Sequence, residues 1–357
     1  MYYPFETQVT PLTTIRRKRM LPAPGEVLVR IGDQVDPPQV IARAELPGDF
    51  RILPVARLLG VPASRVKRYI RVKPGDDVQE GQVIAKRGRL FASTVTSPFN
   101  GMVTASGGGR MLVEARSTTF DLRAQMYGTV CNVIQQRGRH YGVVIETPGA
   151  VIQGAWGAGG ESFGVLKCLT ETASELLEAE AIDPSSQGTI LVGGRGLSEA
   201  ALERAQQLQV RGIVVGGLSP ELIAQAEQLP FPIIVTEGIG AMPMSQPIFR
   251  LLKTNDGREA SVNGQIQTRG GIMRPEVIIP TPADTVPPAE KQPGVPLEVG
   301  ARVRLVRAPH AGKVGTVVAL PVHARRMETG AKVHGAEVDV GQEAPLFAPL
   351  ANLEVLR

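Results

Sequence analysis

The sequence predicts a multidomain α+β protein, in which β-rich parts at both ends flank a central α/β domain with a parallel sheet. Three observations carry this prediction: a duplicated pattern near the start, apolar runs alternating with helix-forming stretches from residue 188, and a proline-rich segment before residue 298. The 357 residues suffice for two to four domains of ~100–200 residues each. The 40 glycines and 29 prolines suit many short strands joined by tight turns.

Composition and charge narrow the class of protein. The formal net charge of +5 allows a polyanionic partner and is equally compatible with an ordinary surface. Aromatic residues make up only 4% of the chain, which disfavours binding of single-stranded nucleic acid by base stacking. No run of about 18 apolar residues occurs, and the basic residues 16–19 precede no apolar core. We therefore expect no membrane span, no secretory signal and a cytoplasmic location.

An internal duplication characterises the first domain, which is predicted over residues 21–120 after an N-terminal extension at 1–20. The stretch 32–42, GDQVDPPQVIA, matches 75–85, GDDVQEGQVIA, at seven of eleven positions. Each Gly-Asp pair predicts a tight turn, because glycine accepts positive φ and aspartate bonds to nearby backbone. An inward valine and a short apolar strand follow. SPFNGMV at 97–103 predicts a further turn and strand.

The repeats together with SPFNGMV resemble the half-motifs of the biotinyl/lipoyl carrier fold, or barrel-sandwich hybrid, with a helical insertion near residues 52–69. In that family two half-motifs pack face to face, and a carrier lysine lies at the tip of the hairpin between them. Here the tip falls near Leu90, while Lys86 comes too early and lacks flanking methionines. The resemblance therefore implies a structural or partner-binding barrel, and we expect no attached cofactor.

A central α/β domain is predicted over residues 121–279. Its β-rich beginning, up to residue 165, suggests strands that either complete the first domain or bridge to the next. Beyond it, continuous apolar strands alternate with helices, which predicts a parallel sheet covered on both faces. The helix at 198–209 has Ser198 as its N-cap, and Ser219 with Pro220 opens the next helix. The expected strands are 189–192, 212–215, 232–235 and 274–280, with a hairpin turn at Asp256-Gly257.

The ends of these strands suggest a ligand site, because ligands of open α/β sheets lie beyond the carboxyl ends of the strands. In one interpretation, backbone N–H groups and helix N-termini hold a small anion, assisted by Arg195 and by the polar Glu237. In the other, the glycines only turn the chain between strand and helix. The dinucleotide fingerprint lacks its third glycine, and no P-loop occurs. The candidate ligand-binding residues are Gly193, Gly194, Arg195, Gly216, Gly217 and Glu237.

Residues 280–297 contain six prolines and predict an extended linker. The following 298–357 segment has an alternating strand at 297–306, a turn closing on Gly312, a strand from Thr316, and further strands at 337–340 and 352–356. This pattern resembles the KOW motif. The resemblance implies a small SH3-like barrel of the kind that contacts RNA or protein in transcription-elongation factors and ribosomal proteins.

The KOW-like segment offers basic residues for such a contact. Alternation places Arg302 and Arg304 on one strand face, which predicts a solvated basic surface. The segment has eight Lys and Arg against six Asp and Glu, so charge alone does not separate an RNA partner from a protein partner. The candidate contact residues are Arg302, Arg304, Arg307 and Lys313.

No catalytic or metal-binding constellation is predicted. The two cysteines, Cys131 and Cys168, form no CxxC pattern, and Lys167 would lower the pKa of the Cys168 thiol without any accompanying base. The four histidines, at 140, 310, 323 and 334, show no ligand spacing and are expected to face solvent.

The sequence favours a non-enzymatic binding or scaffold protein, which contacts RNA or the transcription or translation machinery through the KOW-like barrel. Two alternatives stay open. In one, the α/β domain binds a small anionic ligand at its glycine-rich strand ends and acts as an enzyme. In the other, the repeated β modules build an oligomeric assembly.

Overall fold

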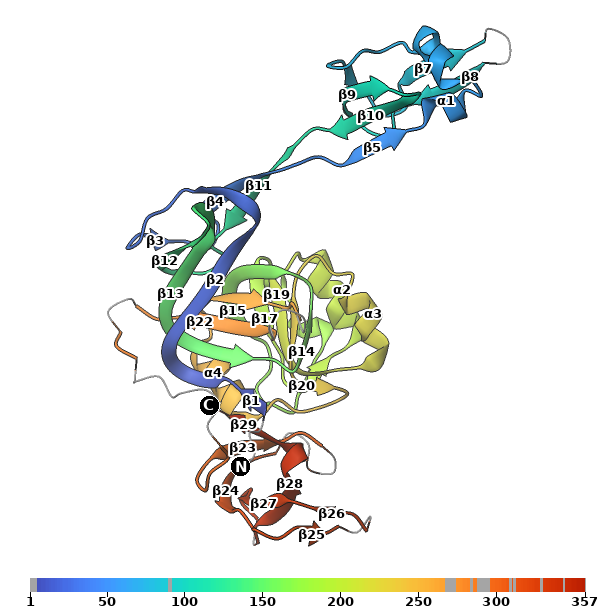
Figure 1. Ribbon diagram of the computed structural model, residues 1–357. Coiled ribbons are helices and arrows are strands. Elements are labelled where there is room, and N and C mark those ends of the chain that lie inside the picture. Colours follow the sequence, from blue (N-terminus) through green and yellow to red (C-terminus); the bar gives the residue numbers. More distant parts are fainter. Residues whose placement is uncertain are drawn as a thin grey trace.

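The computed structural model is mostly β, with few helices (Figure 1). The expected hairpin tip near Leu90, the turn closing on Gly312 and much of the proline-rich linker lie outside the described residues. Those described are 5–88, 92–266, 274–282, 285–287, 296–307, 310, 313–327, 330–342 and 344–356.

One large mixed sheet runs through the molecule, in the strand order β11-β4-β2-β13-β22-β21-β15-β17-β19-β20-β14. Its centre is a long ribbon formed by β2 (Val9–Val27) and β13 (Arg139–Gln153), which pair antiparallel. The ribbon curves from the parallel strands towards the distant end of the molecule (Figure 1). The far end of β13 pairs with β22 (Glu276–Pro280). The β-rich stretch after residue 121 therefore both completes the first module and bridges to the next.

The parallel stretch of this sheet is confirmed. β15 (Glu161–Cys168), β17 (Thr189–Val192), β19 (Gly212–Leu218) and β20 (Ile233–Ile239) pair in parallel order, with β21 (Glu259–Asn263) antiparallel beside β15. Helices α2 (Glu199–Gln207) and α3 (Ile223–Ala226) pack on one face, and α4 (Gln246–Thr254) packs on the other. Ser198 caps α2, its hydroxyl accepting from the Ala201 N–H, as predicted. The short elements here are β14 (Trp156–Ala158), β16 (Leu176–Leu177), β18 (Gly196–Leu197), η2 (Ala179–Ala181), η3 (Pro184–Ser186) and η4 (Pro220–Leu222).

The predicted hairpin at Asp256-Gly257 is wrong. The residues before it form helix α4, so the turn joins a helix to β21. The spacing of Ile248, Phe249 and Leu252 is helical, and these side chains fill the core on that face of the sheet. Pro247 stands in the first turn, where a proline needs no N–H partner.

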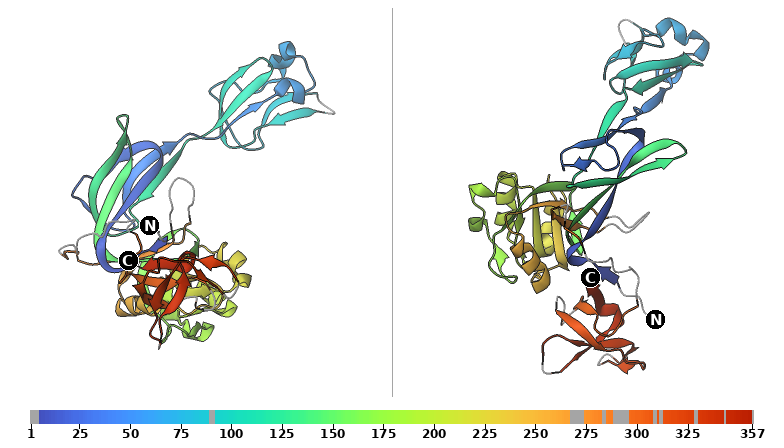
Figure 2. Two further views of the ribbon diagram at one scale, coloured as in Figure 1. Left: turned by 60° about the horizontal axis from the view of Figure 1, so that its bottom comes forward. Right: turned by 90° about the vertical axis from the view of Figure 1, so that its left-hand side faces the viewer.

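Two further β modules lie beyond the parallel-sheet region, one containing part of the ribbon and the other projecting away from it (Figures 1 and 2). We call residues 9–46 with 118–147 the proximal module; it contains β3 (Gln34–Val35), β4 (Val40–Leu46), β11 (Thr118–Arg123) and β12 (Gly128–Gln136). Residues 50–115 form the distal module, which is inserted between β4 and β11 and stands away from the rest on two strands. Its elements are β5 (Phe50–Leu53), α1 (Val55–Leu58), η1 (Ala63–Tyr69), β6 (Asp77–Val78), β7 (Val83–Arg87), β8 (Ser93–Thr96), β9 (Gly101–Gly107) and β10 (Arg110–Ala115).

The two copies of the repeat adopt the same local structure. Gly32 and Gly75 have φ of 95° and 97°, and the following aspartates accept from the backbone N–H three residues back at 2.7 Å in both copies. Each glycine N–H donates across to a valine carbonyl, Val130 in one copy at 2.8 Å and Val103 in the other at 2.7 Å. The duplicated sequence thus specifies a duplicated turn with its own partner strand.

The copies do not pack face to face, as the carrier-fold resemblance implied. The first copy buries Ile41 in the proximal core, whereas the second buries Ile84 in a separate distal core. Each copy finds its partner strand elsewhere in the chain, β12 for the first and β9 for the second. A nested arrangement results, in which one repeat unit is inserted into the other.

The C-terminal module, residues 296–356, forms a six-stranded sheet in the order β1-β29-β23-β24-β27-β28. Strands appear at all four stretches where the sequence predicted them. β1 (Phe5–Thr7), from the other end of the chain, adds to β29 in parallel. The bounds are β23 (Arg302–Leu305), β24 (Val314–Ala319), β25 (Arg325–Arg326), β26 (Lys332–Val333), β27 (Gly335–Asp339), β28 (Leu346–Pro349), η5 (Leu350–Asn352) and β29 (Leu353–Leu356).

Because the proximal and distal modules have separate cores, we expect a core substitution in one module to leave the stability of the other unchanged. Ile84→Ala should destabilise the distal module by about 2–5 kcal/mol, because a fully buried side chain leaves a cavity. Hydrogen exchange should then accelerate in residues 50–115 and stay unchanged in the proximal module, with Ile41→Ala giving the opposite pattern. Val83→Ala, a partly exposed neighbour, is the control. Faster exchange in both modules from either change would show one shared core.

Candidate functional site

The glycine-rich strand ends come together in the structure, but three of the four candidate glycine N–H groups are already used. Gly193 donates to Val214, Gly216 to Gly194, and Gly217 to Arg195, all backbone carbonyls at 2.8–3.1 Å. A Cβ at Gly217 would lie 2.0 Å from the Gly240 oxygen, so only glycine fits this close approach of loops. These groups are therefore occupied in loop packing. Arg195 lies beside them, lining a cavity of about 390 Å³ with Gly217.

Glu237, the polar residue expected in that ligand site, instead belongs to an internal ion-pair network that we call the arginine clamp. Arg304 of β23 reaches across to the end of β20, donating to the Glu237 carboxylate at 2.8 Å and to the Thr236 carbonyl at 2.9 Å. The side chains of Arg304 and Glu237 are 2% and 1% exposed. The strand end thus binds the C-terminal module of the same chain.

The clamp extends through Glu354 of β29. Arg304 donates to this carboxylate at 2.5 and 3.0 Å, and Arg274 donates to its other oxygen at 2.9 Å. Burial opposes the charge of Arg304, but Glu237 and Glu354 outweigh it and raise the pKa of the guanidinium above its ordinary value. The guanidinium stays charged, and its charge is balanced inside the protein.

The prediction that Arg304 faces solvent together with Arg302 is therefore wrong. Alternation does place the two on one strand face, but the parallel-sheet region covers that face at Arg304 and leaves Arg302 exposed. Arg307 and Lys313 are exposed as predicted. Arg302 and Lys313 line one groove between the C-terminal module and the start of α4.

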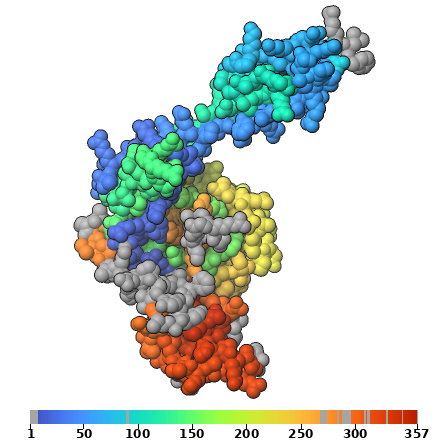
Figure 3. Space-filling view, in the orientation of Figure 1, coloured from blue at the N-terminus to red at the C-terminus, as the bar shows by residue number. Residues whose placement is uncertain are grey.

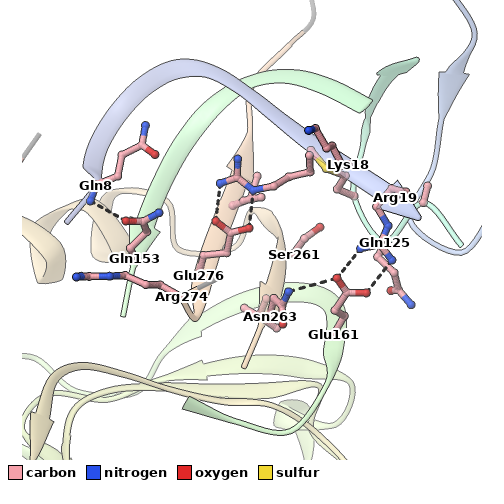
Figure 4. Close-up of a pocket in the computed structure, with 15 residues that line it drawn as sticks. Gln8, Lys18, Arg19, Gln125, Gln153, Glu161, Ser261, Asn263, Arg274 and Glu276 are labelled. Carbon is pink, nitrogen blue, oxygen red and sulfur yellow. Dashed lines mark hydrogen bonds and ion pairs between the residues drawn. The ribbon is translucent and has the colours of Figure 1, made fainter. Parts of the chain in front are cut away.

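A polar cavity of about 330 Å³ lies where the ribbon meets the parallel-sheet region (Figure 4). Arg17 donates two bonds to Glu276 at 2.5 and 2.6 Å, and Arg19 donates two to Glu161 at 2.5 and 2.7 Å. Such bidentate pairs are directional and hold β2 against β15 and β22. The basic run 16–19, which we did not interpret as a secretory signal, is thus part of a strand that contacts two modules.

Gln125 lies at the edge of this cavity with a feature that the sequence did not indicate. Its backbone has φ of 59°, rare for a residue with a Cβ, and its buried side-chain oxygen has no hydrogen-bond partner among the described residues. Its backbone N–H bonds to the Pro37 carbonyl at 2.8 Å, which holds the turn after β11 against the repeat. The cavity chiefly joins two parts of the protein, because Arg17 and Arg19 pair with the two carboxylates that line it.

The distal module holds the strongest charge imbalance in the molecule. Residues 50–115 contain eleven Lys and Arg against four Asp and Glu, a net of +7, so the rest of the chain has a net charge of −2. No ion pair engages any of the ten basic residues in the described part of this segment. Nine are exposed: Arg51, Arg57, Arg65, Lys67, Arg68, Arg71, Lys73, Arg87 and Arg110. The net charge of the whole chain, +5, does not indicate this local excess.

The structure does not support Cys168 as an activated nucleophile. Burial, followed by the nearby Asp256, raises the pKa of the Cys168 thiol to about 12, so the predicted lowering is wrong. Lys167 instead donates to Asp183 at 2.7 Å. Within the described part of the chain, no cluster of three His, Cys, Asp or Glu side chains could hold a metal ion.

A scan against protein-family models and a search of curated proteins gave no match to this chain. None of the helices in the described ranges is both long and apolar enough to cross a bilayer.

Breaking the arginine clamp should be costly. Arg304→Met leaves the Glu237 carboxylate buried without its cation and leaves Glu354 with Arg274 but without Arg304, and we expect a loss of about 3–5 kcal/mol in the free energy of unfolding. Urea denaturation measures the loss, with Arg302→Ala on the same strand as an exposed control. Adding Glu237→Gln and Glu354→Gln to Arg304→Met should restore part of the stability. Equal, small losses in both single variants would contradict the clamp.

The cysteines should differ in reactivity. With a pKa of about 12, only on the order of one Cys168 thiol in ten thousand is ionised at pH 8. Iodoacetamide should therefore modify the exposed Cys131 at least about tenfold faster, as peptide mass spectrometry would record. In denaturant the two rates should converge. Comparable rates in the folded protein would show that Cys168 is an accessible thiolate.

Proposed function

We propose that this protein is a non-enzymatic scaffold that binds structured RNA through the distal module. The observation that supports this most directly is the net charge of +7 in a unit that stands away from the rest of the molecule (Figure 3). Phosphate contacts by Lys and Arg dominate the affinity of nucleic-acid binding. A projecting basic unit can approach a polyanion without repulsion from the remaining −2.

The arrangement of the basic residues favours backbone contact. Arg65, Lys67 and Arg68 are exposed on η1, and Arg71 and Lys73 follow directly. Few aromatic residues accompany them, which disfavours stacking on single strands and favours recognition of a duplex by shape and phosphates. The contact surface proposed here is thus a different one from the C-terminal module that the sequence indicated.

We also propose that the proximal and distal modules are barrel-sandwich hybrids, and that the C-terminal module is a KOW-type SH3-like barrel. The matched turns of the two repeats and their separate cores support the first. The strands at 302–305, 314–319, 335–339 and 353–356, around one core, support the second. Because Arg304 is used internally, this barrel serves first to dock onto the parallel-sheet region.

Fluorescence anisotropy with a duplex RNA of about 20 base pairs tests the proposed function. The triple variant Arg65→Ala, Lys67→Ala, Arg68→Ala should weaken binding at least about tenfold at low salt, and should reduce the slope of log K against log salt by about 2–3. The triple variant Arg302→Ala, Arg307→Ala, Lys313→Ala is the matched control and should bind nearly as wild type.

Further arms identify the kind of polyanion. Duplex DNA of the same length and single-stranded RNA should bind more weakly than duplex RNA. Wild-type protein that shows no salt-dependent RNA binding, or that sediments with phosphatidylserine vesicles while ignoring RNA, would overturn the proposal. An equal loss in the two triple variants would remove the distal module as its site.

A further inference from the structure

The four-stranded sheet of the distal module, in the order β5-β10-β9-β6, has one buried face and one open face. Val103, Met111 and Val113 point to the buried face, where they pack with residues of α1 and η1 in the distal core. The residues that alternate with them lie on the opposite side, because successive side chains of a strand point to opposite faces. We call this side the outer face.

The outer face is apolar and exposed. Strand register places Phe50 and Met102 on either side of Glu114, and Ile52 beside Leu112 in the neighbouring row of this face. The side chains of Phe50, Ile52 and Met102 are 68%, 57% and 40% exposed, and Leu112 is partly exposed. A sheet face in contact with water usually carries polar residues, and a contiguous apolar patch marks an interaction site.

Strand β10 adds one charge of each sign to this face. Arg110 and Glu114 lie on it together with Leu112, since the residues between them are buried in the core. Neither charged side chain takes part in an ion pair within the described part of the chain. They are four residues apart, about 13 Å along an extended strand, which is too far for an ion pair with each other. A cation and a carboxylate therefore flank an apolar centre.

We infer that the outer face binds the outer face of a second copy of this chain. A two-fold axis that crosses the strands at Leu112 runs β10 antiparallel to its counterpart, so positions equally far from Leu112 on opposite sides meet. Arg110 of each copy then faces Glu114 of the other. Its aliphatic stem lies between Phe50 and Met102, while its guanidinium reaches the carboxylate. The face is thus complementary to itself in both charge and apolar surface.

The strand directions leave room for both molecules. The distal module is attached through β4 and β11, which join its sheet at the end that carries Phe50 and Glu114. In the antiparallel arrangement the two attachment points lie at opposite ends of the interface, and each module stands away from the rest of its own chain (Figures 1 and 2). Because η1 packs on the buried face, its basic residues stay accessible. The inference does not depend on the RNA contact proposed above.

Sedimentation velocity of the full chain tests the inference. Wild-type protein should dimerise with a Kd of about 10–100 µM, because a small interface binds weakly. Phe50→Ser should raise this Kd at least about tenfold, since it removes the largest apolar side chain of the face. Leu58→Ser is the matched control, because Leu58 is 50% exposed on α1, outside the outer face, and its loss should leave the Kd unchanged.

Charge exchange tests the geometry. Arg110→Glu and Glu114→Arg should each yield monomers, because either change places like charges together at both symmetric contacts. An equimolar mixture of these two variants should dimerise again, since every contact then joins opposite charges. Arg57→Glu changes an exposed arginine of α1 and should dimerise as wild type does.

Wild-type protein that stays monomeric at about 300 µM would overturn the inference, and so would a mixture of the two charge variants that stays monomeric. Dimers that Phe50→Ser and the charge variants leave intact would place the interface elsewhere on the molecule. If the wild type is monomeric and Phe50→Ser weakens binding of duplex RNA, the occupant of the outer face is RNA and not a second copy.

Discussion

The pairing of β2 with β13 is the contact on which the placement of every other module depends. One end of this ribbon lies in the proximal core, and the other continues through β22 into the strands of the parallel-sheet region. Backbone hydrogen bonds set the register, and the bidentate pairs of Arg17 and Arg19 fix the angle at which the ribbon meets the parallel strands. The distal module is attached only through β4 and β11, so its position follows from the ribbon.

Basic residues are sorted between joints and surfaces. Arg17, Arg19 and Arg304 lie between modules, where each meets a carboxylate from a distant part of the chain. A buried cation must be paired, so it stabilises the contact between two modules only when they are oriented to place a carboxylate beside it. The cations of the distal module that the structure describes have no such carboxylate partners. Basic residues therefore hold modules together in one region and stay accessible to anions in another.

The sequence predicted the local structure well, because turns, caps and buried strands depend on neighbouring residues. The repeat turn at Gly32, the cap at Ser198 and the apolar runs of the parallel strands are examples. The sequence did not predict which distant strands pair, because no residue near Ile41 or Ile84 shows that each copy joins a different core. Likewise, alternation placed Arg304 on the correct strand face, but which neighbour covers that face depends on the docking of two modules. The charge excess of residues 50–115 can be counted in the sequence. Only the structure shows that these residues form one separate module.

The nesting of one repeat inside the other imposes an order on synthesis. The first copy emerges early from the ribosome, yet its partner strand β12 follows only after the whole distal module has been made. The second copy has its partner β9 close behind it and can fold while the first still waits. We therefore expect the inner unit to fold first on a nascent chain, before the outer unit pairs its first copy with β12. Because the chain is made from its N-terminus, the insertion of one unit in the other determines the order in which their partner strands become available.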